Sequence, residues 1–321
     1  MIKRLRVLDT DQFIDILDDS FIRELKHMGG KYGLNKKEMK ITYFLMRLLQ
    51  TLFGAIRDIP DICAYYEEDK VLGVTKIVPY NARKDHWYSE VTAVRKNIQK
   101  KGTGTALKEY TVSHYRKNAR RLFGNVREEN IPMLKTNTRV GYKPYTKKVL
   151  LTRSAPHRGK NLENPEKLIK NGEEVEGFRP FKKDEKGVYN LYMRRTPEDV
   201  ARIEDKTSED FEYGSVVKLL SLLKRLRGKR DRKFVIERGG SICAYFWFED
   251  IGLECDGLEI LLDPRAENLS ELVRHIVSLV SPDRNVICYV PEYRDAERNA
   301  LMNAGFELGE VYISMVVECD E

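Results

Sequence analysis

Hydrophobic and polar residues recur at two different periods along residues 1–150. Apolar residues return every three or four positions in stretches such as 37–56, and this spacing places them on one face of an amphipathic helix. Other short runs are rich in β-branched and aromatic residues, which is typical of strands. Because the two periods alternate repeatedly, the pattern predicts a mixed α/β unit.

The elements expected in this first part follow from these periods. Strands are expected at residues 3–8, 62–66, 71–79, 87–94, 122–126 and 147–152. Helices are expected at residues 37–56, 102–118 and 131–140, and a further one after Thr10 or Asp11, whose side chains can cap free N–H groups. In the strand 87–94, simple alternation would place Tyr88, Glu90, Thr92 and Val94 on one side.

Residues 151–185 are polar and rich in Lys, Glu, Asn and Gly, so they are predicted to form a connector with room for one short strand. The pattern then starts again. Strands are expected at 189–194, 234–237, 242–248, 258–262, 286–290 and 311–317, and helices from Thr196-Pro197 onward and at 216–226, 269–280 and 296–304.

The order of elements is the same in both halves, and small landmarks repeat. A Gly–aromatic pair follows the last helix of each half, at Gly141-Tyr142 and at Gly305-Phe306. At about 150 residues per domain, 321 residues suit two domains. The sequence therefore predicts a tandem duplication, with domains at 1–150 and 186–321 and the connector at 151–185.

Composition excludes several classes of protein. Hydrophobic residues make up 41% and charged residues 33%, which is enough apolar material for real cores and argues against wholesale disorder. Five scattered cysteines without a CxxC pair exclude a zinc ribbon and suit a reducing cytosol. The first residues lack the apolar core of a signal peptide, and the stretch 41–56 is interrupted by Arg47 and Gln50. We therefore expect a cytoplasmic protein without a membrane span.

The net charge of +7 is unevenly distributed. Residues 1–150 contain 30 Lys and Arg against 17 Asp and Glu, whereas residues 186–321 contain 19 against 26. Such an excess favours a polyanionic ligand in the first part, either nucleic acid or a phosphate-rich cofactor. The alternative is that the charge serves solubility alone.

The clearest motif follows the strand 87–94 and leads into a predicted helix. Gly102 and Gly104 remove side chains where backbone can approach a ligand, and the helix start offers unpaired N–H groups to an anion. Lys100 and Lys101 add positive charge. A nucleoside-triphosphate loop would need Gly-Lys-Ser/Thr, which is absent, and a dinucleotide loop would need a third glycine where Leu107 stands.

The pattern Gln99-x-x-Gly102-x-Gly104 after a strand resembles the coenzyme A pyrophosphate loop of the GNAT acyltransferase superfamily. The segment from Asn130 to Gly141-Tyr142 is similar to the last helix of that fold. The resemblance implies an α/β fold with a mixed sheet, two tandem GNAT-like domains and acetyl-CoA as cofactor.

The resemblance also implies roles for individual residues. Backbone amides from Lys100 through Lys101, Gly102, Thr103 and Gly104 to Thr105, together with Gln99, would hold the pyrophosphate. Ala93 and Val94 would pair with the pantetheine arm, which Asn130 would also contact, and Glu90 would act as the base that takes the amine proton. No metal is implied. Many members have a tyrosine as general acid where this chain has Asn137, so the acid stays unassigned.

The second half departs further from this pattern. Arg294 stands at the position of the cofactor-binding Asn, and the loop from Asp263 to Glu267 lacks glycine and would repel phosphate. We therefore expect a degenerate C-terminal copy that supports the fold or shapes the substrate cleft.

The leading interpretation is an N-acetyltransferase that acts, as a monomer or homodimer, on a primary amine of a small molecule or peptide. A non-catalytic acyl-CoA-binding or regulatory protein is the alternative. A nucleic-acid binder is a weaker third reading, because the basic stretches lack interleaved aromatic residues and a recognition motif.

Overall fold

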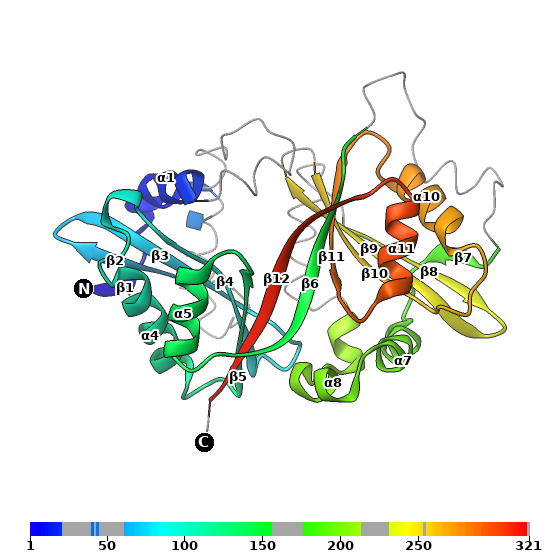
Figure 1. Ribbon diagram of the computed structural model, residues 1–321, viewed down its shortest axis with the longest axis horizontal. Helices are drawn as coiled ribbons and strands as arrows, with labels where there is room; N and C mark the ends of the chain where they lie inside the picture. The colour runs from blue at the N-terminus through cyan, green and yellow to red at the C-terminus, as the bar shows by residue number, and fades with distance from the viewer. Residues whose placement is uncertain are drawn as a thin grey trace. The chain divides into compact units, whose positions relative to one another are not determined.

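The structure of the protein is a computed structural model that describes residues 1–20, 40–41, 43–44, 61–155, 176–212, 231–252 and 255–319 (Figure 1). These residues belong to two compact units. The described residues up to Tyr145 form the first unit together with those from Tyr312 onward, and residues between Thr146 and Val311 form the second. The first unit therefore contains both ends of the described chain.

The first unit is built on a mixed sheet with the strand order β1-β2-β3-β4-β5-β12. Only β4 and β5 run parallel, and the other neighbours are antiparallel. The strands are β1 (Ile2–Arg4), β2 (Asp61–Glu67), β3 (Lys70–Pro79), β4 (His86–Val94), β5 (Arg121–Arg127) and the part of β12 (Glu307–Glu318) from Tyr312 onward. The helices are η1 (Val7–Asp9), α1 (Thr10–Ser20), η2 (Lys96–Ile98), α4 (Thr103–Tyr115) and α5 (Ile131–Arg139).

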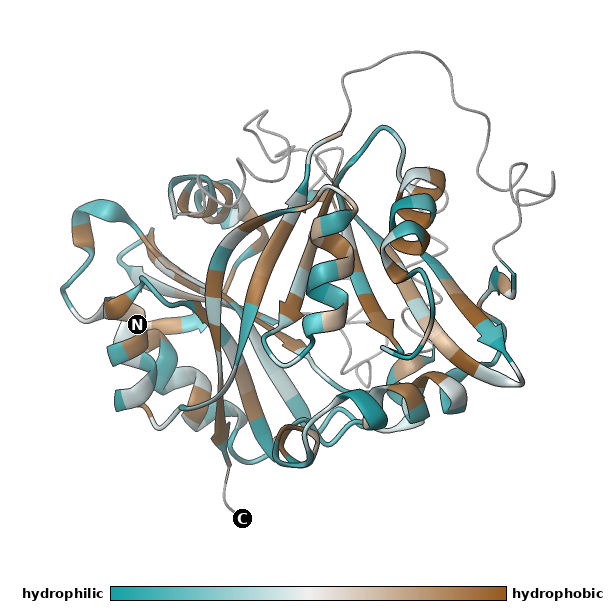
Figure 2. Ribbon diagram, turned by 45° about the vertical axis from the view of Figure 1, so that its right-hand side comes forward, coloured by the Kyte–Doolittle hydropathy of each residue, from teal (hydrophilic) through white to brown (hydrophobic). Residues whose placement is uncertain are grey.

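Helices cover both faces of this sheet, and each face has its own core. On one face, Phe13, Ile14 and Ile16 of α1 pack against β2, β3 and β4. On the other face, Val112 and Tyr115 of α4 pack against β3, β4, β5 and β12. Figure 2 shows helices with a hydrophobic and a hydrophilic side, as expected for helices that lie on a sheet.

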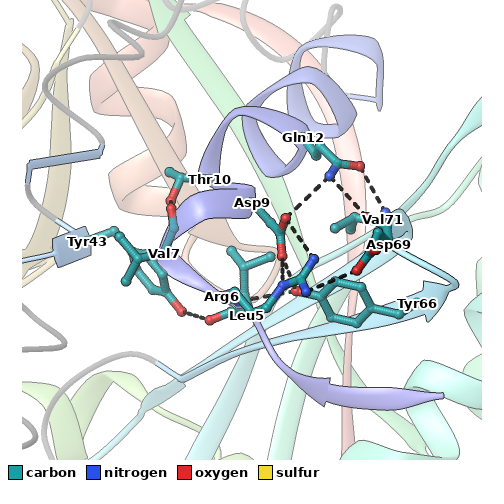
Figure 3. A network of polar contacts seen from close by, with 10 residues as sticks. All are labelled: Leu5, Arg6, Val7, Asp9, Thr10, Gln12, Tyr43, Tyr66, Asp69 and Val71. Atoms are coloured by element: carbon teal, nitrogen blue, oxygen red, sulfur yellow. Dashed lines mark hydrogen bonds and ion pairs between the residues drawn. The ribbon is translucent and has the colours of Figure 1, made fainter.

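A polar network fixes the start of α1 to the first hairpin (Figure 3). Asp9 accepts hydrogen bonds from Arg6 Nε at 2.5 Å and from the Tyr66 hydroxyl at 2.8 Å, and Gln12 Oε1 accepts from the backbone N–H of Val71 at 2.9 Å. Burial opposes the ionisation of Asp9, but the hydrogen bonds from Arg6 and Tyr66 lower its pKa below the ordinary value. The charged network therefore holds α1 against β2 and β3.

A β-bulge in β4 changes which residues face which helix. The pairing of β3 with β4 shifts between Lys76, opposite Val91, and Ile77, opposite Ser89, so Glu90 is the extra residue. Before the bulge Trp87 belongs to the α4 side, and after it Val91 and Ala93 belong to the α1 side. The prediction that 88, 90, 92 and 94 share one side is therefore wrong, because simple alternation does not continue through a bulge.

The second unit repeats this architecture with the strand order β6-β11-β10-β9-β8-β7, in which β10 and β11 are the parallel pair. Its strands are β6 (Lys143–Arg153, from Thr146), β7 (Phe178–Pro180), β8 (Arg232–Arg238), β9 (Ser241–Gly252), β10 (Cys255–Leu262), β11 (Asn285–Pro291) and the part of β12 up to Val311. Its helices are α7 (Glu185–Arg195), α8 (Glu198–Glu204), η3 (Ser208–Phe211), α10 (Leu269–Val280) and α11 (Asp295–Asn303). Again α7 lies on one face, and α10 and α11 lie on the other.

The last strand of each half has been exchanged. In the first unit β5 pairs with β12, the final strand of the chain, over Tyr312–Glu318. In the second unit β11 pairs with β6, the final strand of the first half, over residues 148–153. Each sheet is therefore completed by a strand from the other half of the sequence.

Most of the expected elements are confirmed within a few residues. The strand predicted at 189–194 is wrong, because this segment belongs to helix α7. Val188, Leu191 and Tyr192 are buried at helical spacing, whereas the prediction followed the alternation of Tyr189, Leu191 and Met193. The opening strand of the second half is instead β7, inside the predicted connector. The helix predicted at 216–226 and most of the one at 37–56 lie outside the described residues, as do residues 156–175 of the connector. The domain limits 1–150, 151–185 and 186–321 stay a prediction.

Candidate functional site

A cavity of about 590 Å³ opens in the first unit where β4 and β5 separate. These parallel strands are paired only from His86 to Ser89 on β4 and from Arg121 to Gly124 on β5. Beyond that point β4 continues to Val94 and β5 to Arg127 without pairing to each other. The cavity therefore lies at the carboxyl ends of two parallel strands, a common place for ligands in α/β sheets.

The structure brings nearly all of the predicted site residues together around this cavity. Only Lys101, which is exposed, does not line it. The predicted residues that line the cavity are Glu90, Ala93, Val94, Gln99, Lys100, Gly102, Thr103, Gly104, Thr105 and Asn130.

The loop between β4 and α4 turns through two left-handed residues. Lys100 has φ +66° and Gly102 has φ +86°, and only glycine adopts this region without steric cost. The side chain of Gln99 is tied back to the end of β4, since its Nε2 donates to Val94 O at 3.1 Å. The loop is thereby held in a shape that a side chain at position 102 would strain.

The start of α4 faces the cavity with Thr103, Gly104 and Thr105. First-turn N–H groups have no partner within a helix, and Gly102 at the N-cap has no side chain to accept from them. These N–H groups and the positive end of the helix dipole can therefore bind an anion such as a pyrophosphate.

Of the two glycines where α4 meets the sheet and the cavity, only Gly73 sets how closely the helix approaches. A Cβ at Gly73 of β3 would lie 3.0 Å from Leu107 Cδ1 and 3.1 Å from Ala93 O, so this glycine allows the helix to pack tightly. A Cβ at Gly104 would lie 3.7 Å from Val94 Cγ2, which is ordinary contact. Alanine therefore fits at 104, whereas a long side chain would compete with a ligand for the cavity.

Glu90 owes its position to the bulge in β4, since bulges redirect side chains. Its carboxylate is paired with Lys76 of β3, with Nζ 2.6 Å from Oε2 and 2.8 Å from Oε1, and its side chain is 40% exposed. The Glu90 carboxylate is thus oriented by a charge partner at the edge of the cavity, where an incoming amine could reach it.

Asn130 and Asn137 lie on the same helix but in different surroundings. Asn130 is the N-cap of α5, and its Oδ1 accepts from Met133 N at 3.2 Å. Asn137 is fully buried, its Nδ2 is 3.7 Å from Met315 Sδ, and it does not line the cavity. Asn130 can therefore contact a ligand, whereas Asn137 cannot exchange a proton with one.

Sequence reasoning missed Lys108 of α4, which lines the cavity although it is only 4% exposed. Its Nζ donates to Ser89 Oγ at 2.7 Å, and burial lowers the pKa of its ammonium group to about 8. The helical spacing indicates this position, because Lys108 follows Gly104 by one helical turn and precedes Thr111 and Tyr115, which are buried, by three and seven residues. A lysine on the buried face of a helix is unusual, and this lysine lies beside the cavity.

In the second unit, side chains occupy the position that corresponds to the cavity of the first unit. The N-cap of α10 is Asn268 with φ +56°, the counterpart of Gly102. Asp263 is held by Arg265, whose guanidinium lowers the pKa of that carboxyl to about 2. Glu297 of α11 is fully buried and accepts from Leu262 N at 3.1 Å and from Arg195 Nη2 at 3.0 Å. A carboxylate therefore binds a backbone N–H at the end of β10.

Arg294 is the N-cap of α11, as Asn130 is of α5, which supports the alignment of these two residues. Arg294 is only 7% exposed and lies over the Tyr192 ring, 5.9 Å from its centroid.

Among the helices that the structure describes, none combines the length and apolar character needed to cross a membrane.

The chain is similar to the Acetyltransferase (GNAT) family over residues 32–142, and this match supports acyl transfer as the general class of activity. No curated protein matches the chain. Among solved structures, a tandem GNAT protein from the clavulanic acid biosynthesis pathway superposes with a TM-score of 0.60 at 15% identity, covering 100% of this chain and 99% of that one. A GCN5-related N-acetyltransferase from Sphaerobacter thermophilus has a TM-score of 0.62 at 13% identity, covering 100% and 96%.

At these identities the likeness to solved structures concerns the fold. It extends over both units, and the family match covers the strands, the loop and the helix start that surround the cavity. The predicted fold class is confirmed. The fold of the chain is that of a tandem GNAT protein, and residues 32–142 are similar to the GNAT family.

Proposed function

We propose that the protein is an N-acetyltransferase that transfers an acetyl group from acetyl-CoA to a primary amine of a small molecule or peptide. The observation that carries this proposal is the cavity at the separation of β4 and β5, where an anion-binding helix start and a carboxylate line one space. The first unit performs the reaction in this proposal, and the second supports the fold or shapes the acceptor cleft.

Each group at the cavity has a role in the proposed reaction. The N–H groups from Lys100 to Thr105 hold the pyrophosphate of CoA. The pantetheine arm binds as an added strand along Ala93 and Val94, which pair with β3 on one side and no longer pair with β5 on the other. Acetyl-CoA supplies a thioester, whose carbonyl carbon accepts a nucleophile. An ammonium has no lone pair, so Glu90 takes the proton of the amine before or during its direct attack.

Release of CoA thiol from acetyl-CoA with a panel of primary amines tests the proposal. Turnover that depends on one class of amine is expected. Tight CoA binding without turnover for any amine would favour the alternative, a non-catalytic acyl-CoA-binding protein, which the substitution of the usual tyrosine by Asn137 supports. A cytoplasmic location and a monomeric or homodimeric state stay predictions.

A further inference from the structure

Among the polar side chains that line the cavity, Lys108 is the least exposed, at 4%. It lies where β4 and β5 begin to separate, because its hydrogen-bond partner Ser89 is the last residue of β4 that pairs with β5. Both residues line the cavity and both are buried. The ammonium of Lys108 therefore lies at the closed end of the cavity, beside Ser89. The phosphate-binding loop follows Val94, at the other end of the part of β4 that does not pair with β5.

Among the residues that the structure describes, no carboxylate forms an ion pair with Lys108. Its Nζ lies 5.4 Å from the centroid of the Tyr142 ring, and burial is the only cause of its lowered pKa. The ring of Tyr142 lies against Lys108. The other titratable and charged groups that line the same cavity are Asp19 of α1, Glu90 of β4, Lys96, Lys100, Arg127 of β5 and Tyr312 of β12, and Glu90 is paired with Lys76 of β3. A buried ammonium without a counter-charge is costly, so the fold retains it against its own stability.

When an amine attacks a thioester, negative charge forms first on the carbonyl oxygen and passes to sulfur as the C–S bond breaks, and the thiolate formed in this second stage is the group that Lys108 can protonate. We propose that the Lys108 ammonium is the general acid that protonates the CoA sulfur as acetyl transfer proceeds. This inference rests on the proposed N-acetyltransferase function. It supplies the acid that the sequence left unassigned at Asn137.

The step balances in atoms and electrons. The amine nitrogen forms a bond to the acetyl carbon, and the C–S bond breaks with its electron pair passing to sulfur. Lys108 Nζ then gives one proton to sulfur, and Glu90 has received one from the amine. The nitrogen, now bonded to the acetyl carbon, loses its second proton to the neutral Lys108 amine, which restores the ammonium, and Glu90 releases its proton to water, so the net products are the amide, the CoA thiol and one proton.

The pKa of the Lys108 ammonium suits this transfer. A thiol titrates near about 8.5, and proton transfer is most efficient when donor and acceptor have similar pKa values near the working pH. The pKa of Lys108 at about 8 meets this condition, whereas an exposed lysine near about 10.4 would hold its proton more firmly.

The test uses bound CoA and needs no knowledge of the acceptor. The thiol of CoA is titrated in the complex through the ultraviolet absorbance of the thiolate, for the wild type and for Lys108→Met. An opposite charge within about 4–6 Å lowers a thiol pKa by about 1–3 units, so the thiol should titrate at least about one pH unit lower in the wild type than in the variant. Wild type should also prefer CoA over desulfo-CoA near pH 8, and Lys108→Met should bind both equally.

Two further variants support the comparison of wild type with Lys108→Met, one as a control and one as a substitute. Lys117→Met removes an exposed lysine just beyond α4 and should leave the thiol titration as in the wild type. Lys108→Gln removes the charge but can still donate to Ser89, and it replaces Lys108→Met if that variant does not fold.

The outcomes separate this inference from the proposed function. If the variants and the wild type bind CoA with the same thiol titration, Lys108 is not the acid, although the proposed function stands. If Tyr312→Phe rather than Lys108→Met raises the thiol pKa, the acid is Tyr312 and the inference is overturned. If the wild type binds no CoA, both the proposed function and this inference fall.

Discussion

Replacing Lys108 by Met should change the pH dependence of stability in a defined direction. The ammonium group of Lys108 has a pKa of about 8 in the folded protein, against 10.5 for an ordinary lysine. Between these values the unfolded chain binds a proton that the folded protein lacks. Because the unfolded state binds more protons, the stability of the wild type rises with pH across this window.

The magnitude follows from the difference between the two pKa values. One pKa unit corresponds to about 1.36 kcal/mol, so the buried charge of Lys108 costs about 3 kcal/mol below pH 8. This cost is relieved as the pH rises toward 10.5. Loss of the hydrogen bond to Ser89 offsets part of the gain in Lys108→Met by an amount that varies little with pH. The difference in unfolding free energy between variant and wild type should therefore shrink by about 2–3 kcal/mol from pH 7 to pH 10.

Urea denaturation at several pH values measures this difference. The protein has two tryptophans, of which Trp87 packs against Tyr115 in the first unit, so a Trp247→Phe background lets fluorescence report that unit alone. Lys117→Met in the same background is the matched control. Parallel pH curves for wild type and Lys108→Met would refute the reasoning, because they would mean that Lys108 titrates alike in folded and unfolded protein.

Four further predictions concern the cavity and the two halves. Gly104→Glu should abolish CoA binding in calorimetry, while Gly104→Ala, whose Cβ fits 3.7 Å from Val94 Cγ2, should retain it; equal affinities would exclude this loop. Glu90→Gln should lower turnover by roughly 10²–10⁴ with CoA affinity unchanged, and a loss of only a few-fold would place the base elsewhere. Titration should give one CoA per chain, because Asp263 and Glu297 occupy the second unit's equivalent place; two sites would contradict this. Residues 1–150 expressed alone should be poorly folded, because β5 lacks its partner β12, so a soluble, active fragment would argue against the strand exchange.

The sequence predicts those parts of the fold that depend on local patterns. The order of strands and helices follows from hydrophobic periods, and the loop from Gln99 to Gly104 follows from the need for backbone close to an anion. Helix α10 was expected at its observed limits, because Leu272, Val273, Ile276 and Val277 form one apolar face. Such features are set by residues that are neighbours in the chain.

Features that depend on distant residues were not predicted. The bulge at Glu90 arises from the register of β3 against β4, which alternation within β4 cannot show. The exchange of last strands could not be predicted because β6 and β12 have similar sequence patterns. Each follows a Gly–aromatic pair and closes its half of the chain, so the pattern does not show which of them pairs with β5 and which with β11. Lys108 was overlooked because its chemistry depends on burial beside Ser89, on another element.

The exchanged strand also sets the order in which the protein can mature during synthesis. Tyr312 forms part of the cavity wall, and Ser314 Oγ donates to Asn125 Oδ1 at 2.9 Å across a sequence separation of 189 residues. The sheet of the first unit therefore cannot close while the ribosome is still translating the second half. Contacts of such high sequence separation slow folding, and β5 remains an unpaired edge until they form. A nascent chain thus carries the phosphate-binding loop long before it has a complete site, and chaperone protection of β5 would matter most in that interval.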